Sequence, residues 1–170
     1  MRLVPGLRLL TALACTAVSA CSAGTGSETV FRTLTEEDGN RASFDIEMSD
    51  STGSYTMSLI TRIQKGGGTP AVLTMDITLA SPSGASGTET VTFPSDYRAI
   101  RQYTKEHPED ERIRLAGTPG YYDISWAYRD RIIPPETGTW HIDISLPDTA
   151  DGKVLGLGIT LEHHGKGQNT

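Results

Sequence analysis

The sequence predicts an all-β fold: a single antiparallel β-sandwich, jelly-roll-like, with at most one short helix around residues 96–106. Most segments alternate apolar and polar side chains, which is the pattern of strands with one buried and one solvent-facing side. Loops rich in Gly, Pro and Ser separate these segments. The sequence has no internal repeat and no sign of a second domain, so we expect residues 30–164 to form one domain.

Five strands are expected in the first half of the domain. They are residues 30–34, 42–48, 54–64, 71–80 and 88–93. The side chains that their alternation assigns to the core are Phe44, Ile46, Met48, Tyr55, Met57, Leu59, Ile63, Leu73, Met75, Ile77 and Leu79. Residues 65–70 read Lys-Gly-Gly-Gly-Thr-Pro, a turn sequence, so strands 54–64 and 71–80 are predicted to form a hairpin.

The second half contains the predicted helix and the remaining strands. Ser95 or Asp96 is expected to cap a helix that runs to about Glu106, before Pro108. The expected strands are residues 112–115, 121–129, 138–146 and 154–163, followed by a polar tail over 165–170. Their predicted core side chains are Tyr122, Ile124, Trp126, Tyr128, Trp140, Ile142, Ile144, Leu146, Leu155, Leu157, Ile159 and Leu161.

The N-terminus has the layout of a lipoprotein signal peptide. Arg2 and Arg8 supply a basic start, an apolar run follows, and Val18-Ser19-Ala20-Cys21 matches a lipobox. The apolar run is shorter than the roughly 20 residues that a membrane span needs. We therefore expect residues 1–20 to be removed and Cys21 to be acylated, so that acyl chains hold the protein on a bilayer. Residues 21–29 would form a flexible tether. The alternative is an ordinary signal peptide with an incidental cysteine.

Charge and cysteine content exclude several classes of function. The chain has 15 Lys and Arg against 21 Asp and Glu, and the loss of Arg2 and Arg8 makes the mature domain more acidic. An acidic chain does not bind nucleic acid through counterion release, so no nucleic-acid partner is expected. The two cysteines are Cys15, inside the leader, and Cys21. The mature domain therefore has no thiol for a disulfide, a metal site or a nucleophile.

The motifs for catalysis and metal binding are weak, so we predict no enzyme, no metal and no cofactor. His163 and His164 are neighbours on a strand, point to opposite faces and cannot chelate together. The Asp148-x-x-Asp151-Gly152 segment lacks the spaced acids and closing Glu of a calcium loop. The sequence has no Gly-x-Ser-x-Gly elbow. A Ser-His-Asp triad built from distant residues and a carboxylate pair acting on glycans stay open.

Aromatic residues gather in the C-terminal half and suggest an alternative function, carbohydrate binding. They are Tyr121, Tyr122, Trp126, Tyr128 and Trp140. Four of them share a strand face with core side chains and are expected to pack there, whereas Tyr121 points to the opposite face. Tyr121 is therefore the candidate contact residue for a ligand or a protein partner.

The C-terminal half also resembles a known family. The residues that carry the resemblance are Tyr121-Tyr122-Asp123-Ile124, Ile133-Pro134, Gly138-Thr139-Trp140-His141-Ile142 and Val154-Leu155-Gly156-Leu157-Gly158-Ile159. With the lipobox, residues 30–164 look like the gliding-motility-associated lipoproteins of Bacteroidota, the H member of that set. The resemblance implies a non-catalytic cell-envelope lipoprotein, a membrane-anchored accessory or scaffold for an envelope machine, with another envelope protein as its partner.

The residues after Cys21 give an expected location. Ser22 stands where an Asp often signals retention in the inner membrane, which favours the outer membrane. The first acidic residue of the tether, Glu28, is well separated from Cys21, which favours the periplasmic side over the cell surface. We therefore expect a lipid-anchored protein of the outer membrane that faces the periplasm.

Overall fold

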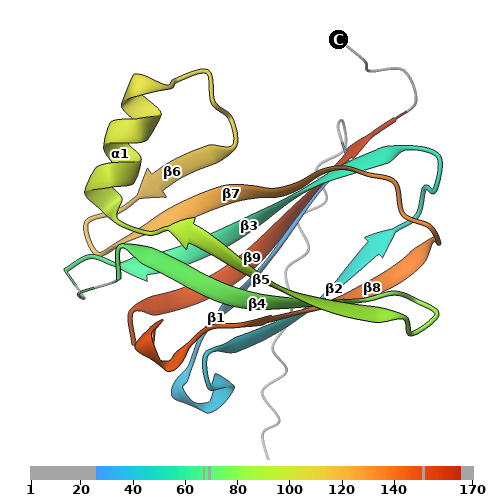
Figure 1. The fold of residues 1–170 in the computed structure, drawn as a ribbon, viewed down its shortest axis with the longest axis horizontal. Coiled ribbons are helices and arrows are strands. Elements are labelled where there is room, and N and C mark those ends of the chain that lie inside the picture. The colour runs from blue at the N-terminus through green and yellow to red at the C-terminus, as the bar shows by residue number, and fades with distance from the viewer. Residues whose placement is uncertain (1–25, 67, 69, 151, 166–170) are drawn as a thin grey trace, which may run out of the picture.

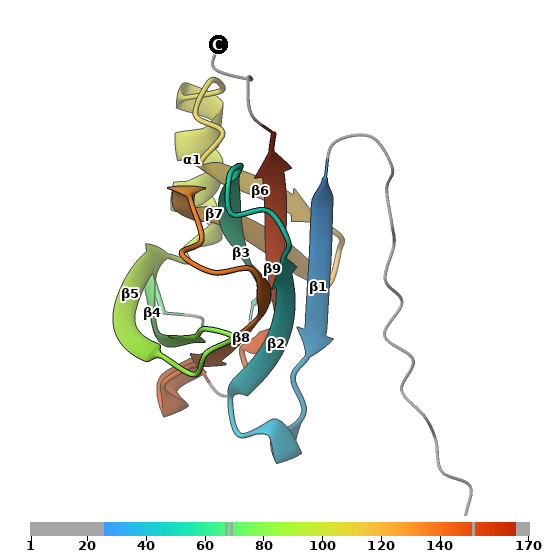
Figure 2. The same cartoon turned by 90° about the vertical axis from the view of Figure 1, so that its right-hand side faces the viewer.

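Within residues 26–66, 68, 70–150 and 152–165, which the computed structural model describes, nine strands form two antiparallel sheets that pack face to face (Figure 1). Sheet A has the order β1-β9-β3-β7-β6 and sheet B the order β2-β8-β4-β5. The view along the layers in Figure 2 shows β1 and β2 on the same side of the sandwich, one in each sheet. The predicted antiparallel β-sandwich is confirmed.

The elements have the following bounds. Sheet A contains β1 (Ser27–Thr33), β3 (Ser54–Gln64), β6 (Ile113–Gly117), β7 (Tyr121–Ile132) and β9 (Val154–His164). Sheet B contains β2 (Arg41–Met48), β4 (Val72–Ala80), β5 (Ser86–Pro94) and β8 (Gly138–Ser145). The helix α1 spans Tyr97–Glu106, and two 3-10 turns, η1 and η2, span Glu36–Asp38 and Asp148–Ala150.

The strand order is that of a jelly roll. The first strand pairs with the last, and β2 pairs with β8. From β1 to β4 each strand lies in the other sheet from the strand before it, and β5 then pairs with β4 in sheet B. The short strand β6 extends sheet A beyond β7. Every strand pair is antiparallel, and most pairs join segments that are far apart in the sequence.

The predicted hairpin between residues 54–64 and 71–80 is wrong. The strand β3 pairs with β7 and β9 in sheet A, whereas β4 pairs with β5 and β8 in sheet B. Alternation identifies the buried face of each strand but does not identify its hydrogen-bonded neighbour. The segment between Gln64 and Val72 is long enough to cross the gap of about 10 Å between packed sheets.

The core lies between the sheets and contains most of the side chains that alternation assigned to it. Buried members include Phe44, Ile46, Met57, Leu59, Ile77, Ile142, Ile144 and Ile159. At the start of β9 the prediction fails, because Val154 is buried and Leu155 is half-exposed. The pairing of β3 with β9 shifts register between Arg62 and Ile63, and this irregularity moves Val154 to the inner face.

The helix α1 closes one end of the sandwich, beside β6 and β7 (Figure 1). Asp96 caps it, as predicted, because its carboxylate accepts a hydrogen bond from the backbone N–H of Ala99 at 2.8 Å. Ile100 is buried against Tyr122 and Trp126, which extend the inner face of β7 beyond the main core. The helix therefore covers the inner side of sheet A and leaves its outer side open.

The N-terminal predictions concern residues that the structure describes only in part. Cys21 and the leader lie outside the described residues. The first strand begins at Ser27, three residues before the expected start at residue 30. Among the residues that the structure describes, no helix is long and apolar enough to cross a membrane.

Candidate functional site

The outer face of sheet A is the surface on which the predicted contact residue lies. Tyr121, at the start of β7, is half-buried on this face. Tyr122 and Trp126 point into the core with 4% and 7% exposure, which confirms their predicted packing. Tyr128 and Trp140 also pack against the core but remain half-exposed. Tyr121 is the member of this aromatic group that lies on the outer face beside Arg62, and Tyr128 also reaches the edge of a groove on that face.

The ring of Tyr121 is in contact with the guanidinium of Arg62. The Cζ atom of Arg62 lies 4.2 Å from the centroid of the Tyr121 ring and 4.7 Å from that of Phe31, which are cation–π distances. Arg62 also donates two hydrogen bonds to the carboxylate of Asp123, at 2.8 and 2.9 Å. These hydrogen bonds raise the pKa of Arg62 above its ordinary value. The guanidinium therefore covers part of the ring that a sugar would need.

Phe31 reaches Arg62 by crossing β9, which lies between β1 and β3. The crossing depends on Gly156 and Gly158, the two glycines of β9 on this face. A Cβ atom at Gly156 would lie 2.5 Å from Cζ of Phe31, and one at Gly158 would lie 2.8 Å from its Cδ2. Any larger residue at either position would displace the ring. We call Phe31, Arg62, Tyr121 and Asp123 the Arg62 cluster.

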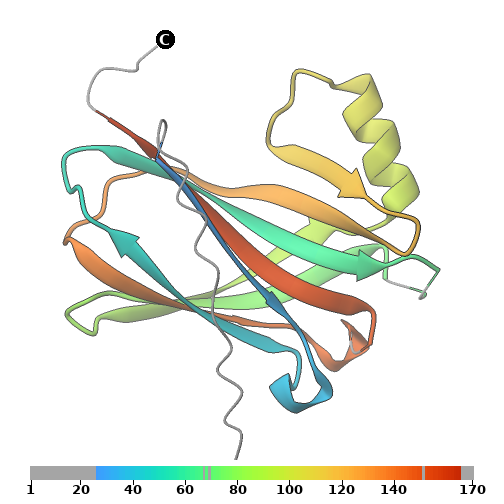
Figure 3. The ribbon, with the colours of Figure 1, turned by 180° about the vertical axis from the view of Figure 1, so that it is seen from behind.

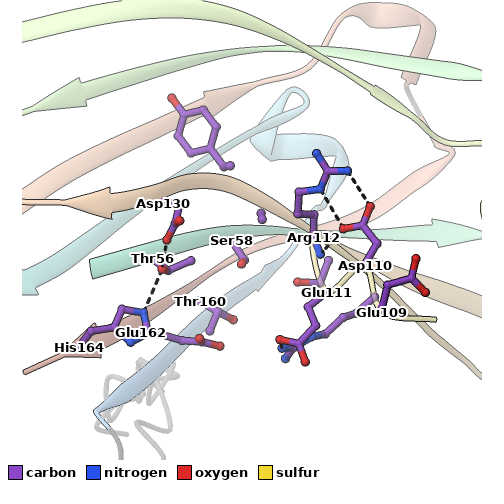
Figure 4. A pocket seen from close by; sticks show the side chains of 14 residues that line it. Thr56, Ser58, Glu109, Asp110, Glu111, Arg112, Asp130, Thr160, Glu162 and His164 are labelled. Atoms are coloured by element: carbon purple, nitrogen blue, oxygen red, sulfur yellow. Dashed lines mark hydrogen bonds and ion pairs between the residues drawn. The ribbon is translucent and has the colours of Figure 1, made fainter. Parts of the chain in front are cut away.

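An open groove of about 800 Å³ lies on the same outer face (Figure 4). Its floor consists of small side chains from the three central strands of sheet A: Thr56, Ser58, Ser125, Ala127 and Thr160. One rim comes from the segment after α1, with Glu109, Asp110, Glu111, Arg112 and Arg114. The other rim contains Asp130, Glu162 and His164. The groove is thus wide, polar and bordered mainly by carboxylates.

The first rim is fixed to α1 through Asp110. Its carboxylate accepts hydrogen bonds from the guanidinium of Arg112 at 2.7 and 2.8 Å and from the hydroxyl of Tyr103 at 2.6 Å. Arg112 first, and then Tyr103, holds the pKa of Asp110 well below its usual range. The same contact raises the pKa of Tyr103. Asp110 and Arg112 therefore bind each other and hold this rim against α1.

On the second rim, Thr56 connects an acid and a histidine. The hydroxyl of Thr56 donates its hydrogen to the carboxylate of Asp130 at 2.8 Å. Because that hydrogen is then in use, the Nε2–H of His164 donates to the Thr56 hydroxyl oxygen, at 3.0 Å. His163 points to the other face of β9, where its Nε2 lies 3.1 Å from the carboxylate of Asp50. The two histidine rings therefore lie on opposite faces of β9, as their neighbouring places in a strand predicted.

The described residues contain no group of three or more His, Cys, Asp or Glu side chains that is placed to hold a metal ion. The predicted loop around Asp148 is only partly described, because Asp151 lies outside the described residues. What the outer face does offer is a row of hydroxyls on the floor and carboxylates on both rims. This arrangement suits the binding of a polar surface that carries basic groups.

The Arg62 cluster and the groove were not recognised from the sequence. The cluster requires the order β1-β9-β3-β7, which brings Phe31, Arg62 and Tyr121 together from distant parts of the chain. One signal was present: the solvent side of the last strand carries Gly156 and Gly158, which is unusual for a solvated strand face. Glycines at those places indicate that another group approaches the backbone.

No protein-family model matches the chain, and no curated protein matches it. Among solved structures, the CspB protease of Clostridium perfringens aligns with 79% of this chain at 15% identity and a TM-score of 0.37. The chain spans 25% of that protease chain. A virus-like particle of the prawn nodavirus from Macrobrachium rosenbergii aligns at 9% identity and a TM-score of 0.12, over 96% of this chain and 97% of that chain.

Proposed function

We propose that this protein is a non-catalytic, lipid-anchored component of the cell envelope that works by binding another envelope protein through the groove on sheet A. The observation that carries the proposal is the groove itself, which is lined by small polar side chains on the outer face of sheet A. The strands of sheet A face the viewer in Figure 3, and α1 does not cover them. The lipobox at Cys21 supports the envelope location. The resemblance to gliding-motility-associated lipoproteins suggests an accessory or scaffold role in an envelope machine.

The charges of the groove suggest the chemistry of the partner. Glu109 and Glu111 project from the first rim with side-chain exposures of 76% and 84%. Asp130 stands on the opposite rim. Carboxylates on two sides favour a partner surface that presents Lys or Arg, and they discourage contact with a second acidic copy of this chain.

A photo-crosslinking residue placed on the groove floor tests the proposal directly. We expect a photoreactive amino acid at Ser58, in the centre of β3, to capture one defined envelope protein in living cells. The same amino acid at Thr74, on the exposed outer face of sheet B, is the matched control and should capture none. Equal capture from both positions, or from neither, would count against the groove as the contact surface.

A charge test separates the groove from general acidity. The double variant Glu109→Gln, Glu111→Gln should weaken partner recovery, and added salt should weaken recovery by the wild type. The matched control is Glu36→Gln, Glu37→Gln, which removes two exposed acids from η1. A control variant that lost the partner to the same extent would show that net charge, and not the rim, attracts it.

Carbohydrate binding through Tyr121 is the second candidate function. The observation in its favour is that Tyr121 lies on the outer face beside Arg62 and Asp123, which carry hydrogen-bonding groups. A glycan array with the domain and with its Tyr121→Ala variant tests this function. Saturable binding that depends on Tyr121 would favour it over the protein partner.

A further inference from the structure

One end of the sandwich brings together the start of β1 and the connection between β7 and β8. The backbone N–H of His163 donates to the carbonyl of Gly26 at 2.7 Å. His163 is in register with Tyr55, which is also in register with Ile132. Gly26, His163, Tyr55 and Ile132 therefore lie in one row across β1, β9, β3 and β7. Three strand spacings separate Gly26 from Ile132, a distance of about 15 Å. We call this the tether end; the connections β2–β3, β4–β5 and β7–β8 lie there, at the right of Figure 1.

The length of chain between Cys21 and Ser27 limits how far this end can lie from a lipid anchor. Five residues separate the two positions. A fully extended chain spans at most about 3.3–3.6 Å per residue, so the link reaches no more than roughly 20 Å. This step rests on the proposed function, because it requires acyl chains on Cys21. With such an anchor, the tether end stays within roughly 20 Å of the lipid on Cys21.

The tether end presents an exposed apolar side chain. Ile133 is 65% exposed, and the one other exposed large apolar side chain of the described residues is Val72, at 50%. Val72 is in register with Pro94, just before α1, and therefore lies at the opposite end of the sandwich. Ile133 therefore lies at the end of the sandwich that the tether keeps near the lipid, and Val72 lies at the end that is farther from the membrane.

We propose that the tether end rests on the bilayer, with Ile133 in the boundary between headgroups and acyl chains. Burial of its apolar surface in that boundary favours this orientation. The charges near Ile133 have both signs: Arg129 pairs with Glu89 at 2.6 Å and Arg131 pairs with Asp130 at 3.7 Å, so the contact suits a zwitterionic lipid surface. The strands of sheet A then rise from the membrane, and the groove faces sideways towards other membrane-anchored proteins.

The experiment uses the acylated protein in phosphatidylcholine vesicles. A cysteine introduced as Ile133→Cys or Val72→Cys is the single free thiol of the mature chain, because Cys15 is removed with the leader and Cys21 is acylated. Each thiol is labelled with a fluorophore that responds to polarity. Lipids that carry a spin label on the acyl chain then quench a fluorophore that contacts them. Far-ultraviolet circular dichroism checks that both variants fold.

We expect the label at position 133 to emit at shorter wavelength and to be quenched several-fold more strongly than the label at position 72. Equal quenching at both positions, or stronger quenching at position 72, overturns the orientation. If the protein floats with vesicles in either of those cases, the lipid anchor stands and only the orientation falls. If the unmodified protein does not float with vesicles, the anchor and the orientation fall together.

Discussion

The ring of Phe31 lies against the backbone of Gly156, so closely that a Cβ atom at Gly156 would come within 2.5 Å of its Cζ. Phe31 belongs to β1, an edge strand, and Gly156 belongs to β9. Through this contact the edge strand reaches over its neighbour to Arg62 on β3. The contact therefore supplements the hydrogen bonds that fix β1 to sheet A.

We predict that Gly156→Ala destabilises the domain by about 1–3 kcal/mol, the usual cost of inserting a methyl group where no space exists. The added Cβ atom would also meet the carbonyl oxygen of Arg32 at 2.8 Å. The free energy of unfolding from urea titration measures the effect. The matched control is Gly87→Ala in β5, where nothing lies within 4 Å of the new Cβ atom. That variant should be neutral or more stable.

A double variant identifies the origin of the loss. In Phe31→Ala, Gly156→Ala the ring is absent, so the Gly156 change should cost less than it does in the presence of Phe31. Hydrogen exchange should show faster opening of β1 in the single Gly156→Ala variant, because the strand loses its contact with Arg62. An equal cost of Gly156→Ala with and without Phe31 would contradict this account.

A buried hydroxyl in β3 gives the second prediction. Thr61 is 1% exposed, and its Oγ1 has no hydrogen-bond partner among the described residues. Thr61→Val replaces this hydroxyl by a methyl group of similar shape and should stabilise the domain by about 1 kcal/mol, since an unpaired buried polar group costs about 1–3 kcal/mol. Thermal unfolding of the variant measures the gain.

The matched control for this change lies on the same strand. The hydroxyl of Thr56 bonds both Asp130 and His164, so Thr56→Val should give no gain and should loosen that rim of the groove. Destabilisation by Thr61→Val would mean that its hydroxyl has a partner, such as an ordered water.

Local sequence signals predicted the faces of the strands and the start of the helix. The cap at Asp96 depends on a hydrogen bond to a residue three positions away, and the burial of Ile77 depends on the two-residue period of one strand. Both are properties of a short segment. The sequence therefore sufficed for the fold class and for most of the core.

Strand pairing and the outer face depend on long-range contacts. The predicted pairing of residues 54–64 with 71–80 was wrong because β3 pairs with β9 and β4 pairs with β8, both from the C-terminal part of the chain. The Arg62 cluster joins β1, β3 and β7, and the groove joins the central strands β3, β7 and β9 to the rim after α1. Neither can be derived from a single chain until the order of the strands is known.

The third prediction concerns pH. The Nδ1–H of His141 donates a hydrogen bond to the carboxylate of Asp45 at 2.7 Å, and the Nε2 of His141 lies 3.3 Å from Asp143. The hydrogen bond with Asp45, supported by the charge of Asp143, raises the pKa of His141 above its ordinary value. Because the folded pKa is raised, the stabilisation is complete below the unfolded pKa of about 6.5 and is lost as the pH rises through the folded pKa.

Urea midpoints of the wild type and of His141→Gln at several pH values measure this effect. The advantage of the wild type should be larger at pH 5.5 than at about pH 9, because the stabilisation declines as the pH rises through the folded pKa. The effect should be small, since His141 and both acids are well exposed to solvent. A wild-type advantage that grows with pH would have the wrong sign for a raised pKa.

The last prediction concerns the anchor. We predict that Cys21→Ala releases the protein from the membrane, because substitution removes the atom that the lipobox presents for acylation. Each buried methylene of an acyl chain contributes about 0.8 kcal/mol to membrane binding, so one exposed isoleucine cannot replace the chains. Membrane fractionation, with palmitate labelling of the wild type, measures both consequences. The matched control is Ser22→Ala, which should stay labelled and membrane-bound. A Cys21→Ala protein that sediments with the membranes as the wild type does would show that another segment anchors the chain.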